Sequence, residues 1–112
     1  MNEELYLHTA VRDLGALVEE APEASIVSRT VYKDENVRVI LFAFAPGEKL
    51  SEHTSSYPAI LQFLAGEAAL TLGEEALDAG PGTWVHMAAN LPHSVEARSD
   101  VQMLLTMITN NQ

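Results

Sequence analysis

The sequence predicts an all-β fold, namely an antiparallel jelly-roll β-barrel with a short N-terminal arm. Two observations lead to this fold class. From residue 25 onward, apolar residues either alternate with polar ones or form short apolar runs, as strands do. Glycine- and proline-containing turns recur about every 8–12 residues, a spacing that is typical of sandwiches and barrels. The 112 residues are enough for one domain with one core.

The first 24 residues carry the weakest pattern, and we assign them to the arm. Leu14, Leu17 and Val18 would share one side of a helix, but Gly15 and Pro22 limit such a helix to a turn or two. The barrel domain is predicted to span all that follows, from residue 25 to residue 112.

The barrel domain begins with two strands that are separated by a turn. Residues 25–33 are rich in β-branched side chains and alternate, and the turn-forming sequence Asp-Glu-Asn follows at 34–36. Residues 37–45 are apolar on both faces, which indicates a strand buried between two layers. Pro46 and Gly47 end this strand.

The remaining strands are shorter. Residues 59–80 are expected to form two or three strands that break at Ala65-Gly66 and at Gly73-Glu74, two hairpin-like positions. Further strands are predicted within residues 80–88, 91–97 and 101–108.

Composition excludes several function classes. Six basic and sixteen acidic residues give a net charge of −10, which disfavours binding to nucleic acids and to anionic membranes. The absence of cysteine excludes disulfides, zinc–thiolate sites and thiol catalysis. The N-terminus does not resemble a signal peptide, and no apolar run approaches the roughly 18 residues of a membrane span. We therefore expect a cytoplasmic protein.

Histidines and glycines recur at a spacing that resembles a known family. Five residues separate Gly47 from His53, and Gly66 follows thirteen residues after that histidine. This pattern is similar to the first motif of the cupins, in which a glycine precedes His-x-His, a glutamate and a second glycine.

The second cupin motif is matched more loosely. Gly82 takes the place of its opening glycine and His93 takes the place of its histidine, whereas Ala88 and Asn90 replace its proline and second glycine. The chain therefore resembles a small single-domain cupin of the conserved-barrel kind, with a degenerate first motif.

The resemblance implies a metal site with two of its ligands kept and two lost. The four ligand positions of metal-binding cupins correspond here to His53, Ser55, Ala59 and His93. Two imidazoles alone hold a divalent ion weakly, because zinc sites generally need three or four protein donors. Zinc, nickel, manganese or iron would need a further partner beside His53 and His93.

Two side chains are candidates for that partner. The amide oxygen of Gln62 is a usable donor for manganese, iron or nickel, but strand alternation puts residue 62 opposite residue 59 unless a bulge near Pro58 reverses it. His86 would approach the two histidines if the Trp84 side of its strand faced the interior.

The resemblance also implies a ligand pocket inside the barrel, lined by apolar side chains and a few hydroxyl groups. Such a cavity suits a small organic molecule with one polar end. The candidate lining residues are Ser55, Tyr57, Phe44, Leu61, Phe63, Trp84 and Met107.

Two functions follow as hypotheses. The first is a metal-dependent enzyme of the oxygenase or isomerase type, which acts on a small organic substrate near His53 and His93. The second is a metal-free module that binds or senses a small molecule without catalysis, and it rests on the lost Ser55 and Ala59 positions. Under either hypothesis a homodimer is expected, because exposed sheet edges need cover.

Overall fold

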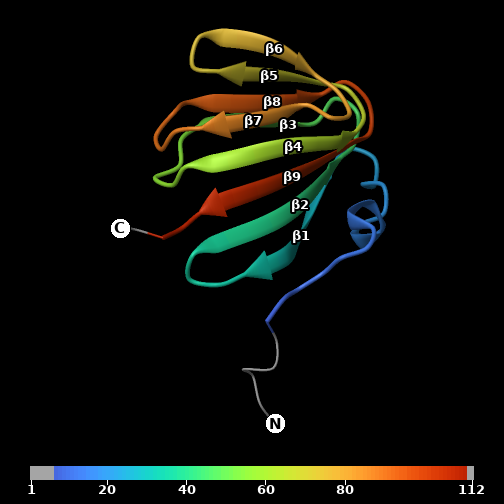
Figure 1. The fold of residues 1–112 in the computed structure, drawn as a ribbon. Coiled ribbons are helices and arrows are strands. Elements are labelled where there is room, and N and C mark those ends of the chain that lie inside the picture. The colour runs from blue at the N-terminus through green and yellow to red at the C-terminus, as the bar shows by residue number, and fades with distance from the viewer. Residues whose placement is uncertain (1–6, 111–112) are drawn as a thin grey trace.

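The computed structural model of the chain describes residues 7–110, so the predictions for residues 1–6 and 111–112 lie outside the described residues. The described part is an antiparallel jelly roll of two facing sheets, which confirms the predicted all-β fold (Figure 1). Its strands are β1 (Ile26–Lys33), β2 (Val37–Phe44), β3 (Lys49–His53), β4 (Ala59–Ala65), β5 (Ala68–Leu72), β6 (Glu75–Ala79), β7 (Trp84–Met87), β8 (His93–Ala97) and β9 (Val101–Ile108).

The strands form a five-stranded sheet in the order β1-β2-β9-β4-β7 and a four-stranded sheet in the order β3-β8-β5-β6. Strand β3 is the element that the sequence did not predict. Most of its residues are exposed and charged or polar, so it carries no apolar alternation. Pairing with β8, including a register shift between Leu50 and His53, is what makes it a strand.

The core lies between the two sheets, and several of its fully buried large side chains lie at one end, which we call the packed end. Its members are large side chains of the five-stranded sheet and a row of alanines of the other sheet, all nearly inaccessible to solvent: Phe44, Phe63, Val101, Ala68, Ala79 and Ala97. Ala68 is the register partner of both Ala79 and Ala97, so small side chains face the bulky ones across the sandwich. Interiors of this kind are close-packed and tolerate little change in volume.

The N-terminal arm covers part of the outer face of the five-stranded sheet. The predicted turn of helix is present as a short 3₁₀ helix, η2 (Leu14–Leu17). The side-chain amide of Gln102 donates a hydrogen bond of 2.9 Å to the carbonyl of Gly15 and so ties η2 to β9. Ala21 then packs with Ala43 and Ala45 in a small second cluster.

Within residues 7–110, no helix has both the length and the apolar character that a membrane span requires.

Candidate functional site

His53 and His93 lie side by side at the end of the sandwich opposite to the packed end. His53 is the last residue of β3, His93 is the first residue of β8, and the two are direct register partners. Their ring centroids are 4.2 Å apart, and the ring planes are inclined by 57°. His93 is buried and His53 is exposed. The two cupin-like motifs therefore place their histidines, which are forty residues apart in the chain, in contact.

Backbone carbonyl groups orient both imidazoles. The Nδ1 atom of His53 lies 2.7 Å from the carbonyl oxygen of Ser51, and Nδ1 of His93 lies 2.8 Å from that of Leu91. A carbonyl oxygen can only accept, so each Nδ1 must carry the hydrogen and donate it. In a neutral imidazole the Nε2 atom is then the one with a free lone pair. Both rings thus present an acceptor or ligand atom.

A pocket of about 180 Å³ adjoins the histidine pair. Part of its floor is a row of inward-facing side chains on three adjacent strands, in which Ala59 of β4 pairs with Met107 of β9 and with Met87 of β7. None of the described lining residues carries a carboxylate, an ammonium or a guanidinium group. The full lining is His53, Ser55, Tyr57, Ala59, Met87, Ala88, Leu91, His93, Leu105 and Met107.

The loop between β3 and β4 supplies the hydroxyl groups of the pocket. The Oγ atom of Ser55 accepts a hydrogen bond of 3.1 Å from the backbone N–H of Tyr57. The carbonyl of Ser55 accepts another, of 2.7 Å, from the N–H of Asn90. This loop is therefore tied both to itself and to the segment before β8, which holds Ser55 and Tyr57 beside the histidines.

The structure corrects the two candidates for a third ligand. In β4, Ala59, Leu61 and Phe63 are buried and alternate with the less buried Ile60 and Gln62, and the register from 59 to 62 is unbroken. No bulge near Pro58 reverses the facing, so Gln62 lies on the outer face of the sheet. In β7, His86 is exposed between the buried Val85 and Met87, so it too lies outside.

Four of the expected lining residues are also placed differently. Trp84 shares the outer face with His86 and is 58% exposed, because β7 turns Val85 and Met87 inward instead. Phe44, Leu61 and Phe63 do face inward, but they are buried in the core and do not line the pocket. Ser55, Tyr57 and Met107 do line it.

Met87, Ala88 and Leu91 line the pocket but were not predicted. The signal for Met87 was available, since it alternates with Val85 in a strand whose other face carries Trp84 and His86. The large aromatic ring of Trp84 led to the prediction that its face of β7 points inward. Only the pairing of β7 with β4 determines which of the two faces is the inner one. Ala88 and Leu91 lie in a loop, where alternation gives no guidance.

The donor set near the pocket does not by itself fit a metal centre. Among the residues that the structure describes, no group of three or more His, Asp, Glu or Cys side chains converges. Ala59 occupies one of the two lost ligand positions and has no donor atom, whereas Ser55 offers a neutral hydroxyl. Two imidazoles fall short of the three or four donors that are usual for zinc.

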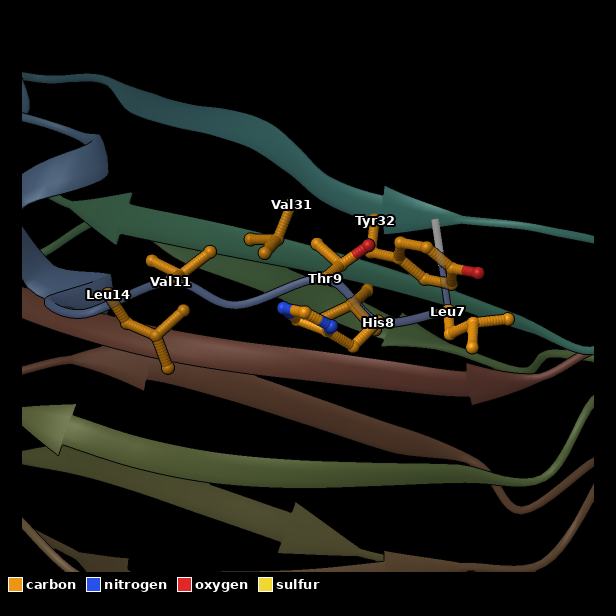
Figure 2. A pocket seen from close by; sticks show the side chains of 8 residues that line it. Leu7, His8, Thr9, Val11, Leu14, Val31 and Tyr32 are labelled. Atoms are coloured by element: carbon orange, nitrogen blue, oxygen red, sulfur yellow. The ribbon is translucent and has the colours of Figure 1, made fainter. Parts of the chain in front are cut away.

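A larger groove of about 450 Å³ lies on the outer face, between the arm and strands β1 and β2 (Figure 2). Its walls are arm residues such as Leu7, which is 88% exposed, together with Val31, Tyr32 and Val39 of the sheet. Among its described walls, His8 is the only histidine, and the other polar side chains are Thr9 and Tyr32, each with one hydroxyl group (Figure 2). The groove therefore offers less chemistry than the smaller inner pocket.

Beside this groove, the Tyr32 hydroxyl donates a hydrogen bond of 2.7 Å to the Asp34 carboxylate. That hydrogen bond and the negative charge of Asp34 raise the pKa of Tyr32. The same bond lowers the pKa of Asp34, and two backbone N–H groups that also donate to its carboxylate lower it further. The pair lies at the β1–β2 turn, and neither residue lines the pocket beside the histidines.

Comparison with known proteins identifies the family and agrees with the fold. The protein-family model described as the cupin domain matches residues 40–109. A cupin superfamily protein from Desulfitobacterium hafniense DCB-2 is 27% identical, with a TM-score of 0.81 over 87% of this chain and 88% of that one. A conserved protein of unknown function from Streptococcus pyogenes is 27% identical, with a TM-score of 0.82 over 94% of this chain and 91% of that one. A search among curated proteins found no significant match.

Proposed function

The chain belongs to the cupin domain family, and from this premise we propose that it binds a small organic molecule in the pocket beside His53 and His93. One observation carries the proposal: two imidazoles in contact, each with its Nδ1 atom held by a carbonyl, border a mostly apolar pocket. Pockets that bind small molecules are mostly apolar with a few well-placed polar groups.

The size of the pocket limits the ligand. A volume of about 180 Å³ is slightly larger than the roughly 150 Å³ of an apolar cavity that takes up benzene. A molecule with a single ring, or an aliphatic molecule of similar size, would fill it. The methionines that line the pocket, Met87 and Met107, are flexible and can adapt to the shape of such a ligand.

The polar end of the ligand would lie at the histidines. In its neutral form each imidazole has a lone pair on Nε2, so in that form the pair favours a group that donates hydrogen bonds, such as a hydroxyl. Neither histidine hydrogen-bonds to a carboxylate within the described residues, because a backbone carbonyl occupies each Nδ1. The acid–histidine pairing that orients a general base is thus missing, which supports binding over acid–base catalysis.

Thermal unfolding in the presence of phenol, cyclohexanol or benzamide tests the proposal. A compound that binds the native state raises the unfolding midpoint by mass action. We expect a rise for at least one of the three in the wild type, a much smaller rise in His93→Asn and an unchanged rise in His86→Asn. His86 is the matched control, because it is a histidine on the outer face. A rise of equal size in all three proteins would contradict the assignment of the site.

A second candidate function is metal binding that a bound small molecule completes. The specific observation in its favour is the hydrogen bond from each Nδ1 to a carbonyl, since histidines that bind metals nearly always donate their other nitrogen in this way. His53 and His93 would hold the ion through Nε2, and the missing donors would come from the small molecule.

Elemental analysis separates the two candidates. Protein purified without an affinity tag would be incubated with zinc or nickel, desalted, and compared with His53→Asn and His86→Asn. Metal that is retained by the wild type and by His86→Asn, but lost from His53→Asn, would support the second candidate. A metal content that is unchanged in His53→Asn would contradict it.

We keep the homodimer as a proposal for the same chain. The arm covers the β1–β2 side of the five-stranded sheet, whereas Trp84 on the β7 edge is 58% exposed. Light scattering at several protein concentrations would test the proposal, with Trp84→Glu as the variant that should weaken the dimer. A monomer at every concentration would contradict it.

A further inference from the structure

Arg38 lies on the inner face of the five-stranded sheet. In β2, Phe42 and Phe44 pack against the core between the sheets, whereas Ala43 packs under the arm on the outer face. The register between β2 and β9 is continuous from Val37 to Phe44, so no bulge changes the facing along the strand. By alternation, Arg38 shares the inner face with the two phenylalanines.

The same register places Arg38 next to the pocket. Arg38 is the partner of Met107 in β9, and Met107 is the partner of Ala59 in β4. Met107 and Ala59 both line the pocket. Adjacent strands are about 4.8 Å apart. Arg38 therefore lies one strand away from a lining residue. It extends the row of inward-facing side chains formed by Met87, Ala59 and Met107.

One donor atom of the Arg38 guanidinium group, Nε, is buried and lacks a hydrogen-bond partner within residues 7–110. The one ion pair among the described residues is that of Arg98 with Asp78, on the surface. Leaving a buried donor without an acceptor costs free energy. The chain has sixteen acidic residues that could have provided an acceptor.

We propose that the ligand of the pocket is a small organic acid whose carboxylate binds Arg38. The inference rests on the proposed function and deepens it. Arg38 does not itself line the pocket, so its side chain would turn toward the ligand. The carboxylate would then accept hydrogen bonds from the guanidinium, while the uncharged polar end of the ligand lies at His53 and His93. Arginine suits this role because its planar fork matches the two oxygens of a carboxylate. Lys33, the register partner of Arg38 in β1, adds a second positive charge nearby.

Matched acid and amide compounds test the inference by isothermal titration. The pairs are 4-hydroxybenzoate with 4-hydroxybenzamide, and benzoate with benzamide, because each amide keeps the shape of its acid without the charge. We expect the wild type to bind at least one acid about tenfold more tightly than its amide, in line with a charge-assisted hydrogen bond. In Arg38→Met the acid should bind no more tightly than the amide, whose own affinity should change less than about twofold.

Arg12→Met is the control, because it removes the same charge from an exposed residue of the arm. It should leave the preference for the acid intact. A second readout is the stability of the free protein. Replacing an unpaired buried donor by an apolar side chain of similar shape is neutral or stabilising, so Arg38→Met without ligand should unfold at the wild-type temperature or above it.

The outcomes separate this inference from the proposed function. Equal affinity of the wild type for acid and amide, or a preference that survives in Arg38→Met, would overturn the role of Arg38 and leave small-molecule binding intact. Failure of the acids, the amides and the three neutral test compounds alike would overturn both.

Discussion

The two ends of the sandwich interior are built from the same strands but filled differently. At the packed end, β2, β4 and β9 contribute Phe44, Phe63 and Val101, each at most 2% exposed. At the other end, which we call the pocket end, the same three strands contribute Arg38, Ala59 and Met107. The β2–β9 register is continuous from end to end, and the β4–β9 register shifts only between Phe63 and Ala65, so the main difference lies in side-chain volume and polarity.

The comparison shows how a cavity arises without any change of fold. A core of native density fills the space between two sheets with large side chains. Ala59 leaves that space empty beside His53 and His93, and the strand spacing is kept by the rest of the sheet. We therefore expect the packed end to contribute more to the stability of the fold than the pocket end does.

Removal of a large side chain should affect the two ends unequally. Phe63→Ala opens a cavity in a region that cannot collapse, and we expect a loss of about 4 kcal/mol in the free energy of unfolding. Met107→Ala only enlarges an existing pocket, so it should cost about half as much or less. Urea denaturation of both variants measures the difference. Equal losses would show that the two ends do not differ in packing.

The turn that follows β4 at the packed end should be nearly as sensitive. Gly66 has φ +86°, and a Cβ atom there would overlap the carbonyl oxygen of Asp100. Gly66→Ala should therefore cost about 3 kcal/mol, from backbone strain and a clash with a neighbouring chain segment. Gly82→Ala is the control, since Gly82 has φ +93° but open space around its Cβ position. It should cost about 1 kcal/mol.

Enlarging a small side chain should also affect the two ends unequally. Ala68→Leu places three carbon atoms among the alanines of the packed end and should cost about 2 kcal/mol. Ala59→Leu directs the same atoms into the pocket, so its cost should stay below about 1 kcal/mol while ligand binding falls at least tenfold. Thermal unfolding with and without phenol or benzoate measures both quantities. Unchanged binding in Ala59→Leu would place the ligand elsewhere.

The smallest effect is expected at the surface turn that leads into the pocket end. Hydrogen bonds from Tyr32, Asn36 and Val37 lower the pKa of Asp34 below its ordinary value of 3.8. A lowered pKa means that the ionised group stabilises the fold above pH 3.8 and that this stabilisation is lost as the pH falls through the folded-state value.

Asp34→Asn should therefore be less stable than the wild type near pH 6, and the difference should shrink as the pH falls to 3. The comparison cancels the other carboxyl groups, because both proteins contain them. Chemical denaturation at each pH measures the difference. A gap that is constant from pH 6 to pH 3 would show that the charge of Asp34 contributes nothing.

Several residues of the site could be predicted from the sequence, and the residues that were predicted wrongly share a physical cause. His53 and His93 were predicted together from two motifs, and strand alternation alone favoured the outer face for Gln62. Trp84 and His86 were harder, because a four-residue strand with apolar groups on both faces does not reveal which face is inner. Strand β3 was missed, since its exposed residues leave no periodic signal.

The sequence by itself determined the all-β fold class, the turns and the two histidine positions, because alternation, glycine and proline act locally along the chain. Only the tertiary structure decided which face of β7 is buried, that the two imidazoles touch, and that Arg38 stands beside Met107 with a buried Nε that has no partner within residues 7–110. Those features depend on the register between strands that are distant in sequence, and no local pattern encodes it.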